Sequence, residues 1–278
     1  MDQLLQEKLE KLYAILKNYS QVLIAFSGGT DSTFLAQVAK NVLGDKVLLV
    51  TANSATYQSS ELTDAVAIAA ELGLPHEVIV SEELDIPEFK DNPADRCYYC
   101  KRELFKKLRA IARSRGIEVI LDGHNLSDNT DYRPGRKAAE ELGVLSPLSL
   151  SGMTKPDIRK LSAEWSLSTA NKPAMACLAS RFPYGETITK EKLLRVETTE
   201  KALRQLGLTQ FRVRSHGTLA RLECIETEIA DAFSKRITIC EIFETAGFIY
   251  SSIDLKGYRT GAMNEVLNPK KSTPEVTK

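Results

Sequence analysis

Apolar and polar positions along this chain form alternating blocks that predict strands and helices in turn. The run Val22–Phe26 is apolar and rich in branched side chains, which is typical of a buried strand. Comparable strands are predicted at Val47–Ala52, His76–Val80 and Val119–Leu121. Strands that alternate with helices indicate a mainly parallel sheet with right-handed crossovers. Before and between the strands, apolar residues recur every three or four positions, which predicts amphipathic helices. One helix begins at the glycines after Phe26 and ends near Gly44. The others are predicted at 2–18, 61–72, 101–115, 135–143 and 156–166.

The order of elements changes after about residue 185. A helix over 189–206 is followed by strands at 211–216 and 219–224, a helix over 226–246 and a strand at 248–254. This αββαβ order predicts a smaller α+β domain after an α/β domain with a parallel sheet. The expected domains are therefore 1–184 and 185–267, with a polar, disordered tail at 268–278.

The first strand leads into Ser-Gly-Gly-Thr-Asp-Ser at residues 27–32. Gly28 and Gly29 allow a tight turn and close approach of a phosphate, and the helix that follows contributes its positive end. Ser27 and Ser32 offer hydroxyl donors, while Asp31 either caps the helix or holds Mg²⁺ on phosphate oxygens. The turn is neither GxxxxGK[ST] nor GxGxxG. The alternative is a turn whose glycines serve geometry alone, but the strand, the Asp-Ser pair and the helix favour a nucleotide loop.

Two further segments follow strands of the predicted sheet. Asn53 ends the second strand, and the polar loop Gly123–Gly135 follows the fourth and carries Asp128, Asp131 and Arg133. Ligands of open α/β sheets bind at the carboxyl ends of strands. We therefore expect Asn53, Gly123 and Asp128 to lie on the nucleotide side, although a solvated turn is the alternative for the loop.

Five cysteines, an odd number, favour metal binding or catalysis over a disulfide framework. Cys97 and Cys100 form a C-x2-C at the entry to a helix, where thiolates are stabilised. The pair alone fits half a zinc site, a redox pair or two core cysteines. Cys177 is a third candidate thiolate, and three are one short of the usual four for a [4Fe–4S] cluster. The other two, Cys224 and Cys240, are predicted to be small buried hydrophobes.

Several arginines are candidates for binding an anion. Arg181 lies in the irregular segment 172–185, which fits neither period and is interpreted as a functional linker. Arg212 and Arg214 are two residues apart on one strand and so share a face, an arrangement that suits phosphate or carboxylate. The alternative is a salt-bridged sheet surface with Glu200, Glu223 and Asp231.

Composition narrows the class of protein. Lys+Arg and Asp+Glu are both 37, and this neutral balance argues against a nucleic acid as the main partner. No apolar run reaches the length of a membrane span, and the N-terminus lacks a signal-peptide core. We therefore expect a cytoplasmic protein without a membrane partner.

These motifs resemble known families. The SGGTDS loop is similar to the pyrophosphate loop of the ATP pyrophosphatase (PP-loop) superfamily, whose domain is adenine nucleotide alpha hydrolase-like. Together with YYCKRELF, LDGHNLSDNTDYRPG, CLASRFPYG and FRVRSHGTLARLE, it resembles the ATP-dependent sulfur transferase (LarE-type) of nickel-pincer nucleotide synthesis, from about residue 5 to 265.

The resemblance implies an enzyme that uses ATP and Mg²⁺ to adenylate a carboxylate of a pyridinium-dicarboxylate mononucleotide, after which sulfur displaces AMP. Some members sacrifice one cysteine, which corresponds to Cys177 here. Because Cys97 and Cys100 are also present, the chain resembles the branch in which three cysteines hold a [4Fe–4S] cluster with an added sulfide. Sulfide or another sulfur donor and a homo-oligomer, a hexamer, are implied as partners.

Two other functions remain open on the sequence. A tRNA-thiolating enzyme of the same superfamily also joins this loop to a three-cysteine cluster, but neutral charge and the lack of terminal zinc-ribbon motifs count against it. A non-catalytic nucleotide-binding module with a structural metal is the third class. The physiological sulfur donor and the roles of Glu200, Glu223 and Asp231 do not follow from the sequence.

Overall fold

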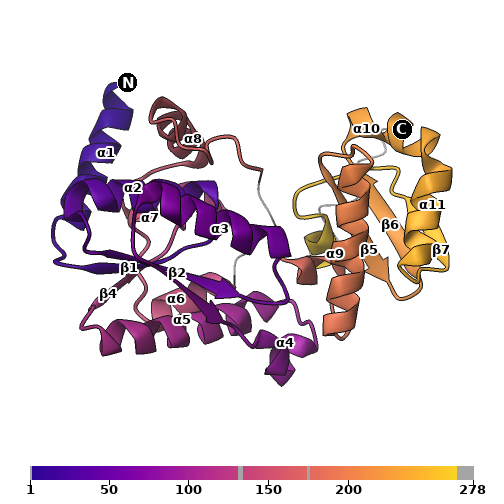
Figure 1. Ribbon diagram of the computed structural model, residues 1–278, viewed down its shortest axis with the longest axis horizontal. Coiled ribbons are helices and arrows are strands. Elements are labelled where there is room, and N and C mark those ends of the chain that lie inside the picture. Colours follow the sequence, from indigo (N-terminus) through magenta and orange to yellow (C-terminus); the bar gives the residue numbers. More distant parts are fainter. Residues whose placement is uncertain (1, 131–133, 174–175, 268–278) are drawn as a thin grey trace, which may run out of the picture. The chain divides into compact units, whose positions relative to one another are not determined.

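The computed structural model describes residues 2–130, 134–173 and 176–267. The chain forms two compact units, both drawn in Figure 1. The first consists of Met1–Phe89 and Asp95–Ala176, and the second of Lys90–Ala94 and Cys177–Lys278. Three of the sequence expectations, the disordered tail at 268–278 and the side chains of Asp131 and Arg133, lie outside the described residues.

The segment Lys90–Ala94 groups with the second unit, because it pairs with the chain after Cys177. The backbone N–H groups of Gly185 and Ile188 donate to the carbonyl oxygens of Asn92 and Lys90, each at 2.9 Å. The buried Asn92 amide also donates to the carbonyl of Pro183 at 2.7 Å. These bonds join positions about 90 residues apart in the sequence, so no local sequence pattern indicates them.

A parallel sheet organises the first unit, as predicted. Its strand order is β3-β2-β1-β4, with Val22 of β1 aligned to Val47 of β2 and to Val119 of β4. The strands are β1 (Val22–Ala25), β2 (Val47–Asn53), β3 (His76–Val80) and β4 (Val119–Leu121). The carboxyl ends of all four strands therefore meet at one edge of the sheet.

Helices cover both faces of this sheet (Figure 1). Successive strand residues point to opposite faces, so Val22 and Ile24 join one buried cluster and Leu23 joins the other. One face carries α1 (Gln3–Leu16), α2 (Thr30–Leu43), α3 (Ser59–Leu72), α7 (Pro147–Leu150) and α8 (Lys155–Glu164), and the other carries α5 (Arg96–Ser114) and α6 (Gly135–Glu141).

The structure corrects two predicted boundaries in the first unit. Helix α5 begins at Arg96 rather than at Lys101, because Tyr98 already closes a turn onto the carbonyl of Asp95 at 2.8 Å. Cys97 and Cys100 therefore lie inside the helix rather than before it. The segment 82–96, predicted as a loop, also contains short helical turns at η1 (Glu83–Asp85) and α4 (Pro87–Lys90), where Pro87 takes the first helical position.

The second unit has the predicted αββαβ order. Its three-stranded sheet follows the order β5-β6-β7, in which β5 and β6 are antiparallel and β6 and β7 parallel. The predicted helix 226–246 is two helices, which meet at Lys235. The elements are η3 (Leu178–Arg181), α9 (Lys190–Gln205), β5 (Phe211–His216), β6 (Leu219–Cys224), α10 (Glu226–Ser234), α11 (Arg236–Thr245), β7 (Tyr250–Ile253) and η4 (Ala262–Leu267).

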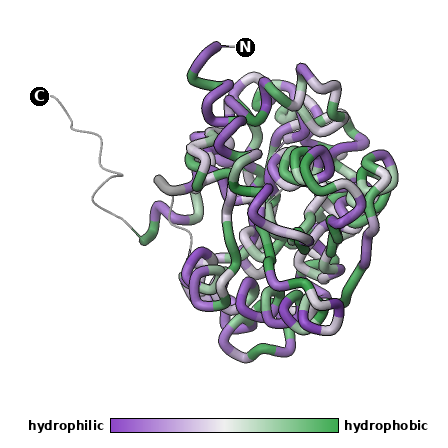
Figure 2. Tube along the Cα trace, turned by 90° about the vertical axis from the view of Figure 1, so that its left-hand side faces the viewer, coloured by the Kyte–Doolittle hydropathy of each residue, from purple (hydrophilic) through white to green (hydrophobic). Residues whose placement is uncertain are grey.

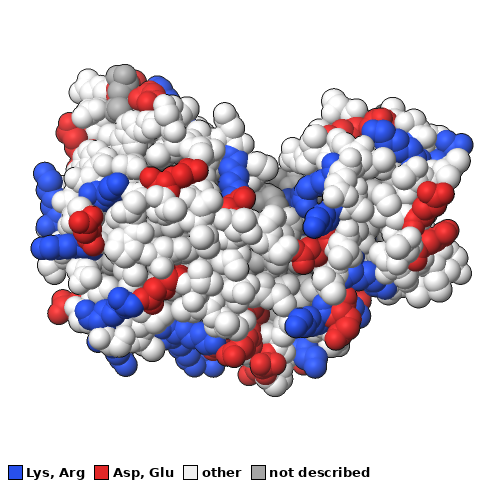
Figure 3. Space-filling view, in the orientation of Figure 1, with Lys and Arg blue, Asp and Glu red and all other residues white. Residues whose placement is uncertain are grey.

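The distribution of polar groups matches the composition. The tube in Figure 2 alternates between hydrophobic and hydrophilic along its helical segments, as amphipathic helices require. Acidic and basic side chains are interspersed on the face seen in Figure 3, without a broad field of one sign. Within residues 2–130, 134–173 and 176–267, every helix is too short or too polar to cross a membrane.

Candidate functional site

The turn between β1 and α2 has the geometry of a phosphate loop. Gly28 adopts φ +64°, and a Cβ built on it would lie 2.7 Å from the Cα of Ala65 in α3. Only glycine fits this position, because both the backbone conformation and the close approach exclude a side chain. Gly29 is different: it caps α2 with φ −83°, and a Cβ there would meet only the Ser27 Oγ, at 3.2 Å.

Two serine hydroxyls tie this turn together. The Oγ atoms of Ser27 and Ser32 are 3.1 Å apart, and the Ser32 hydroxyl donates to the carbonyl of Gly29 at 3.2 Å. The N–H of Gly29 in turn donates to the Ser27 Oγ at 3.3 Å. The predicted hydroxyl donors therefore first shape the loop. The N–H groups of the first helical turn have no acceptor within the helix, so the shaped loop suits an anion.

Of the residues expected beside the loop, Gly123 is placed there. A Cβ on Gly123 would come within 3.0 Å of the Ser32 nitrogen, so its backbone packs directly against the start of α2. Asn53 is exposed at the end of β2. Asp128 accepts the N–H of Asn125 at 3.1 Å and so holds its own turn. No described contact brings Asn53 or Asp128 to the loop, and their nucleotide roles stay predictions.

Asp31 lies in the first turn of α2, but its described contact is not a cap. Its Oδ2 is 2.6 Å from the Nζ of Lys155, at the start of α8. A second lysine, Lys172, donates to the carbonyl of Gly28 at 3.2 Å and to Asp64 at 2.7 Å. The sequence analysis missed both lysines, because each reaches the loop from more than a hundred positions away.

The cysteine pair lies at the start of α5. Cys97 and Cys100 are one helical turn apart and therefore share a face; Cys97 is exposed and Cys100 half-buried. The N-terminal end of a helix carries a partial positive charge, which attracts anions. Near them, Arg102 and Lys137 lie over the ring of Tyr98, at 5.9 and 5.5 Å from its centre.

The other cysteines belong to the second unit. Cys177 directly precedes η3 and is half-buried. Cys224 is fully buried, and burial raises the pKa of its thiol, so its predicted role in the core is confirmed. Cys240 is only half-buried. Among the residues that the structure describes, no three His, Cys, Asp or Glu side chains gather in a group that could hold a metal.

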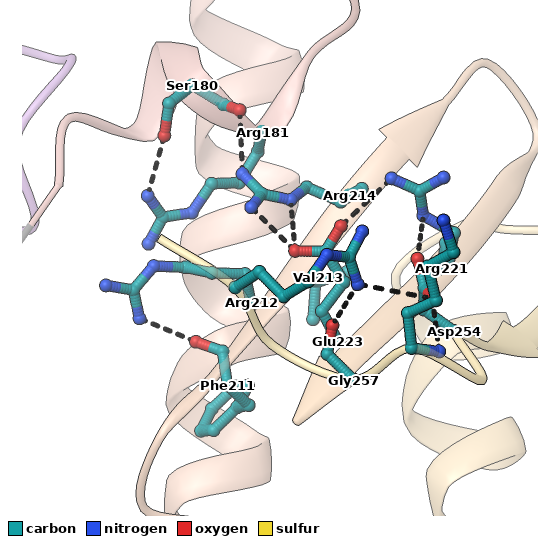
Figure 4. Close-up of polar contacts among 12 residues, drawn as sticks. Ser180, Arg181, Phe211, Arg212, Val213, Arg214, Arg221, Glu223, Asp254 and Gly257 are labelled. Atoms are coloured by element: carbon teal, nitrogen blue, oxygen red, sulfur yellow. Dashed lines mark hydrogen bonds and ion pairs between the residues drawn. The ribbon is translucent and has the colours of Figure 1, made fainter. Parts of the chain in front are cut away.

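A buried arginine cluster occupies the second unit (Figure 4). Arg181 is 1% exposed and donates to both carboxylate oxygens of Glu200, each at 2.9 Å. It also donates to the Ser180 hydroxyl at 3.0 Å and to the Cys177 carbonyl at 3.3 Å. Burial alone would raise the pKa of the Glu200 carboxyl, but the charge and hydrogen bonds of Arg181, together with the Val213 N–H and the charge of Arg212, hold this pKa below its usual range. Arg181 thereby anchors the segment that carries Cys177.

Arg212 and Arg214 share a face of β5 as expected, but their partners differ. Arg214 donates to Glu223 at 2.6 and 2.8 Å, which is an ion pair of the kind that the alternative describes, and its role in binding an anion stays a prediction. Arg212 donates to the carbonyl of Phe211 at 2.6 Å and stacks on Tyr258. The ion pairs are buried rather than at a sheet surface.

Positive charge exceeds negative charge in this cluster. Burial lowers the pKa of the Arg212 guanidinium, and the positive charge of Arg181 lowers it further. Asp231, expected among the carboxylates, pairs instead with Lys235 at 2.7 Å. The cluster therefore has an electrostatic reason to accept an anion.

Comparisons with known proteins agree with this geometry. The NAD synthase family model matches residues 3–118. The chain is 39% identical to the pyridinium-3,5-bisthiocarboxylic acid mononucleotide synthase of Lactiplantibacillus plantarum, over 95% of this chain and 96% of that protein. The chain belongs to this synthase family. The expected family, fold class and ATP-dependent enzyme class are thereby confirmed.

Two other relatives show how far along the chain each likeness extends. An uncharacterised protein of Synechocystis is 43% identical over 95% of this chain and 99% of its own length. A tRNA-specific 2-thiouridylase of Bradyrhizobium diazoefficiens is 28% identical, over 62% of this chain and 53% of that enzyme. The synthase likeness therefore extends through both units, whereas the thiouridylase likeness is partial.

Proposed function

We propose that this protein is an ATP-dependent sulfur transferase that acts on a carboxylate of a pyridinium-dicarboxylate mononucleotide in nickel-pincer nucleotide synthesis. The observation that carries the proposal is the glycine turn, packed against Ala65, in a chain 39% identical to the bisthiocarboxylic acid mononucleotide synthase. The turn supports the use of ATP, and the likeness to the synthase through both units supports the substrate class.

The loop and its neighbours account for the first step. The N–H groups at the start of α2 bind the β- and γ-phosphates, and Asp31 supplies a carboxylate for Mg²⁺. A substrate carboxylate oxygen attacks the α-phosphorus. The bond from that phosphorus to the β-phosphate oxygen breaks, and its electron pair leaves with pyrophosphate. The product is an acyl adenylate, whose acyl carbon is open to attack by sulfur with loss of AMP.

The thiolates suit the second step. Cys97 and Cys100 provide two ligands on one face at a positive helix end, which fits part of the ligand set of a [4Fe–4S] cluster. The third ligand is Cys177, and the proposal requires this residue of the second unit to approach the pair. When bound, the cluster supplies a replaceable sulfide as the sulfur nucleophile. Hexamer assembly, the sulfur donor, the cytoplasmic location and the domain boundaries also stay predictions.

The second candidate function is tRNA thiolation, favoured by the likeness to the 2-thiouridylase. That likeness covers 53% of the thiouridylase, so much of that enzyme has no counterpart here. The net charge of zero lacks the basic excess that an RNA partner usually needs, and acidic and basic side chains are interspersed on the face seen in Figure 3. Sulfur transfer to a mononucleotide is therefore preferred.

The first test is the fate of ATP. With a pyridinium-dicarboxylate mononucleotide present, we expect AMP and pyrophosphate, because the turn lacks the lysine of a Walker loop and is of the pyrophosphate type. Chromatography of the nucleotide products and an ATP–pyrophosphate exchange assay measure this. ADP as the product would refute the proposal. An absence of exchange would indicate a binding module, and transfer of sulfur only to tRNA would favour the second candidate.

The second test compares the two arginines of β5. Arg212→Ala should weaken binding of the mononucleotide substrate by about 1.5–3 kcal/mol, the cost of losing a charged hydrogen bond, and leave ATP binding unchanged. Arg214→Ala should instead lower the free energy of unfolding by about 1.5–3 kcal/mol, because it removes one of the two arginines that pair with the buried Glu223 and leaves Arg221. Calorimetric titration and urea denaturation separate these effects. Equal losses of ATP and substrate binding in Arg212→Ala would assign this arginine to the fold.

A further inference from the structure

Lys155 lies beside the phosphate loop and bonds its acidic residue. The Nζ of Lys155 is 2.6 Å from the Oδ2 of Asp31, at the second position of α2. We propose that Lys155 is the cation that binds the β- and γ-phosphates of ATP, and that Asp31 holds it ready until magnesium-ATP arrives. The inference rests on the proposed function, because it concerns the same ATP-cleaving site.

Nothing in α8 itself calls for a lysine at this position. Lys155 is the first residue of the helix, where the positive end of the helix dipole disfavours a cation. The helix start is already secured by a capping box between Thr154 and Asp157, in which the Lys155 side chain takes no part. A half-exposed ion pair also stabilises a fold only slightly. The Lys155 ammonium therefore lies where the dipole of its own helix disfavours a positive charge, and this placement suits a role in binding an anion.

Ligand binding changes the partners of this pair. Mg²⁺ bound to the Asp31 carboxylate would compete with the ammonium for its negative charge, and the ion pair with Lys155 would weaken. The Lys155 ammonium would then be attracted to the phosphates bound at the start of α2. As the α-phosphorus bond to the bridging oxygen breaks, its electron pair goes to pyrophosphate, and Lys155 neutralises the charge that develops there.

The second lysine near the loop has a different set of contacts. Lys172 donates to the Gly28 carbonyl and to Asp64, so it braces the backbone of the turn. The segment around it is also fixed, because the Thr30 hydroxyl donates to the carbonyl of Thr169 at 2.8 Å. Lys172 thus positions the loop, whereas, within the described residues, the Lys155 ammonium bonds the Asp31 carboxylate, which magnesium is expected to bind.

The experiment measures equilibrium binding of three probes by calorimetric titration with Mg²⁺: ATP, pyrophosphate and AMP. Lys155→Met should raise the dissociation constants of ATP and pyrophosphate about 10- to 100-fold, the range for losing a charged hydrogen bond. AMP lacks the β- and γ-phosphates, so its affinity should not change. Lys155→Arg keeps the charge and should restore most of the affinity for ATP.

Lys8→Met is the matched control, because the Nζ of Lys8 forms an ion pair of 2.7 Å with Asp157 at the same end of α8. It should leave the affinities for ATP and pyrophosphate as in the wild type. The inference is overturned if Lys155→Met binds ATP as well as the wild type, or better because Asp31 is freed for Mg²⁺. It is also overturned if AMP binding falls equally, or if Lys8→Met has the same effect as Lys155→Met, since either result assigns Lys155 to the fold. A wild-type protein that forms ADP would refute the proposed function instead.

Discussion

Replacing Gly29 with valine is expected to abolish ATP cleavage in a protein that still folds. The φ of Gly29 is −83°, which any residue adopts, and a Cβ there meets only the Ser27 Oγ. The added methyl groups project where phosphate oxygens must approach the backbone N–H groups of the turn. Losing one preorganised donor to a reacting oxyanion costs about 10²–10³ in rate, so we expect AMP formation to fall at least that far.

Gly28→Ala is the matched variant that should fail in the opposite way. At Gly28 a Cβ would meet the Ala65 backbone at 2.7 Å, and the φ of +64° is strained for alanine. We expect a clear loss of thermal stability together with lost activity. Thermal denaturation and AMP formation, measured on both variants, separate the two glycines. A Gly29→Val protein with normal AMP formation would show that phosphates do not approach this turn.

The parts of this fold that the sequence predicts are those built from local patterns. The strand Val22–Ala25, its glycine turn and the amphipathic α2 follow from hydrophobic period and turn chemistry, and all three appear in the structure. The αββαβ order of the second unit follows for the same reason. The start of α5 was missed because its first turn is rich in polar and aromatic residues, which give no apolar stripe.

The site is harder to predict because its contacts join distant positions. Lys155 reaches Asp31 only through the packing of α8 against α2, and no spacing in the sequence links the two residues. Arg181 illustrates the same limit. Its motif predicts a functional role, but only the structure shows that its guanidinium donates to Glu200 and to the Cys177 carbonyl. Arg181, which was predicted to bind an anion, thus holds the segment that carries Cys177.

Cys97→Ala and Cys100→Ala are each expected to remove bound iron and repeated turnover. A cysteine thiolate can attack the acyl adenylate, but releasing its sulfur breaks the Cβ–S bond and consumes the enzyme after one event. Three thiolates that hold a [4Fe–4S] cluster avoid this loss. Protein reconstituted without oxygen should be brown and contain iron and acid-labile sulfide, and should turn over repeatedly with sulfide. Each of the two alanine variants should be nearly colourless and inactive after reconstitution.

Cys240→Ala is the matched control, since this half-buried cysteine lies in α11 of the second unit and belongs to no proposed ligand set. It should keep its iron and its turnover. Cys177→Ala should lose activity under either chemistry, because Cys177 is both the third proposed ligand and the residue available for sacrifice. The pair in α5 is therefore the discriminating position, and Cys177 is not.

The sacrificial alternative predicts the opposite result for the Cys97 and Cys100 variants. If Cys177 gives up its own sulfur, Cys97 and Cys100 at the start of α5 take no part in the sulfur transfer. Changing either to alanine should then leave a single turnover intact. Mass spectrometry after that turnover would find Cys177 lighter by one hydrogen sulfide molecule, as dehydroalanine. Cys97 is exposed and Cys100 half-buried, and the two share a face at the positive end of α5, so both positions are compatible with the cluster alternative. Iron-free protein after anaerobic reconstitution, with Cys177 converted to dehydroalanine, would decide for sacrifice.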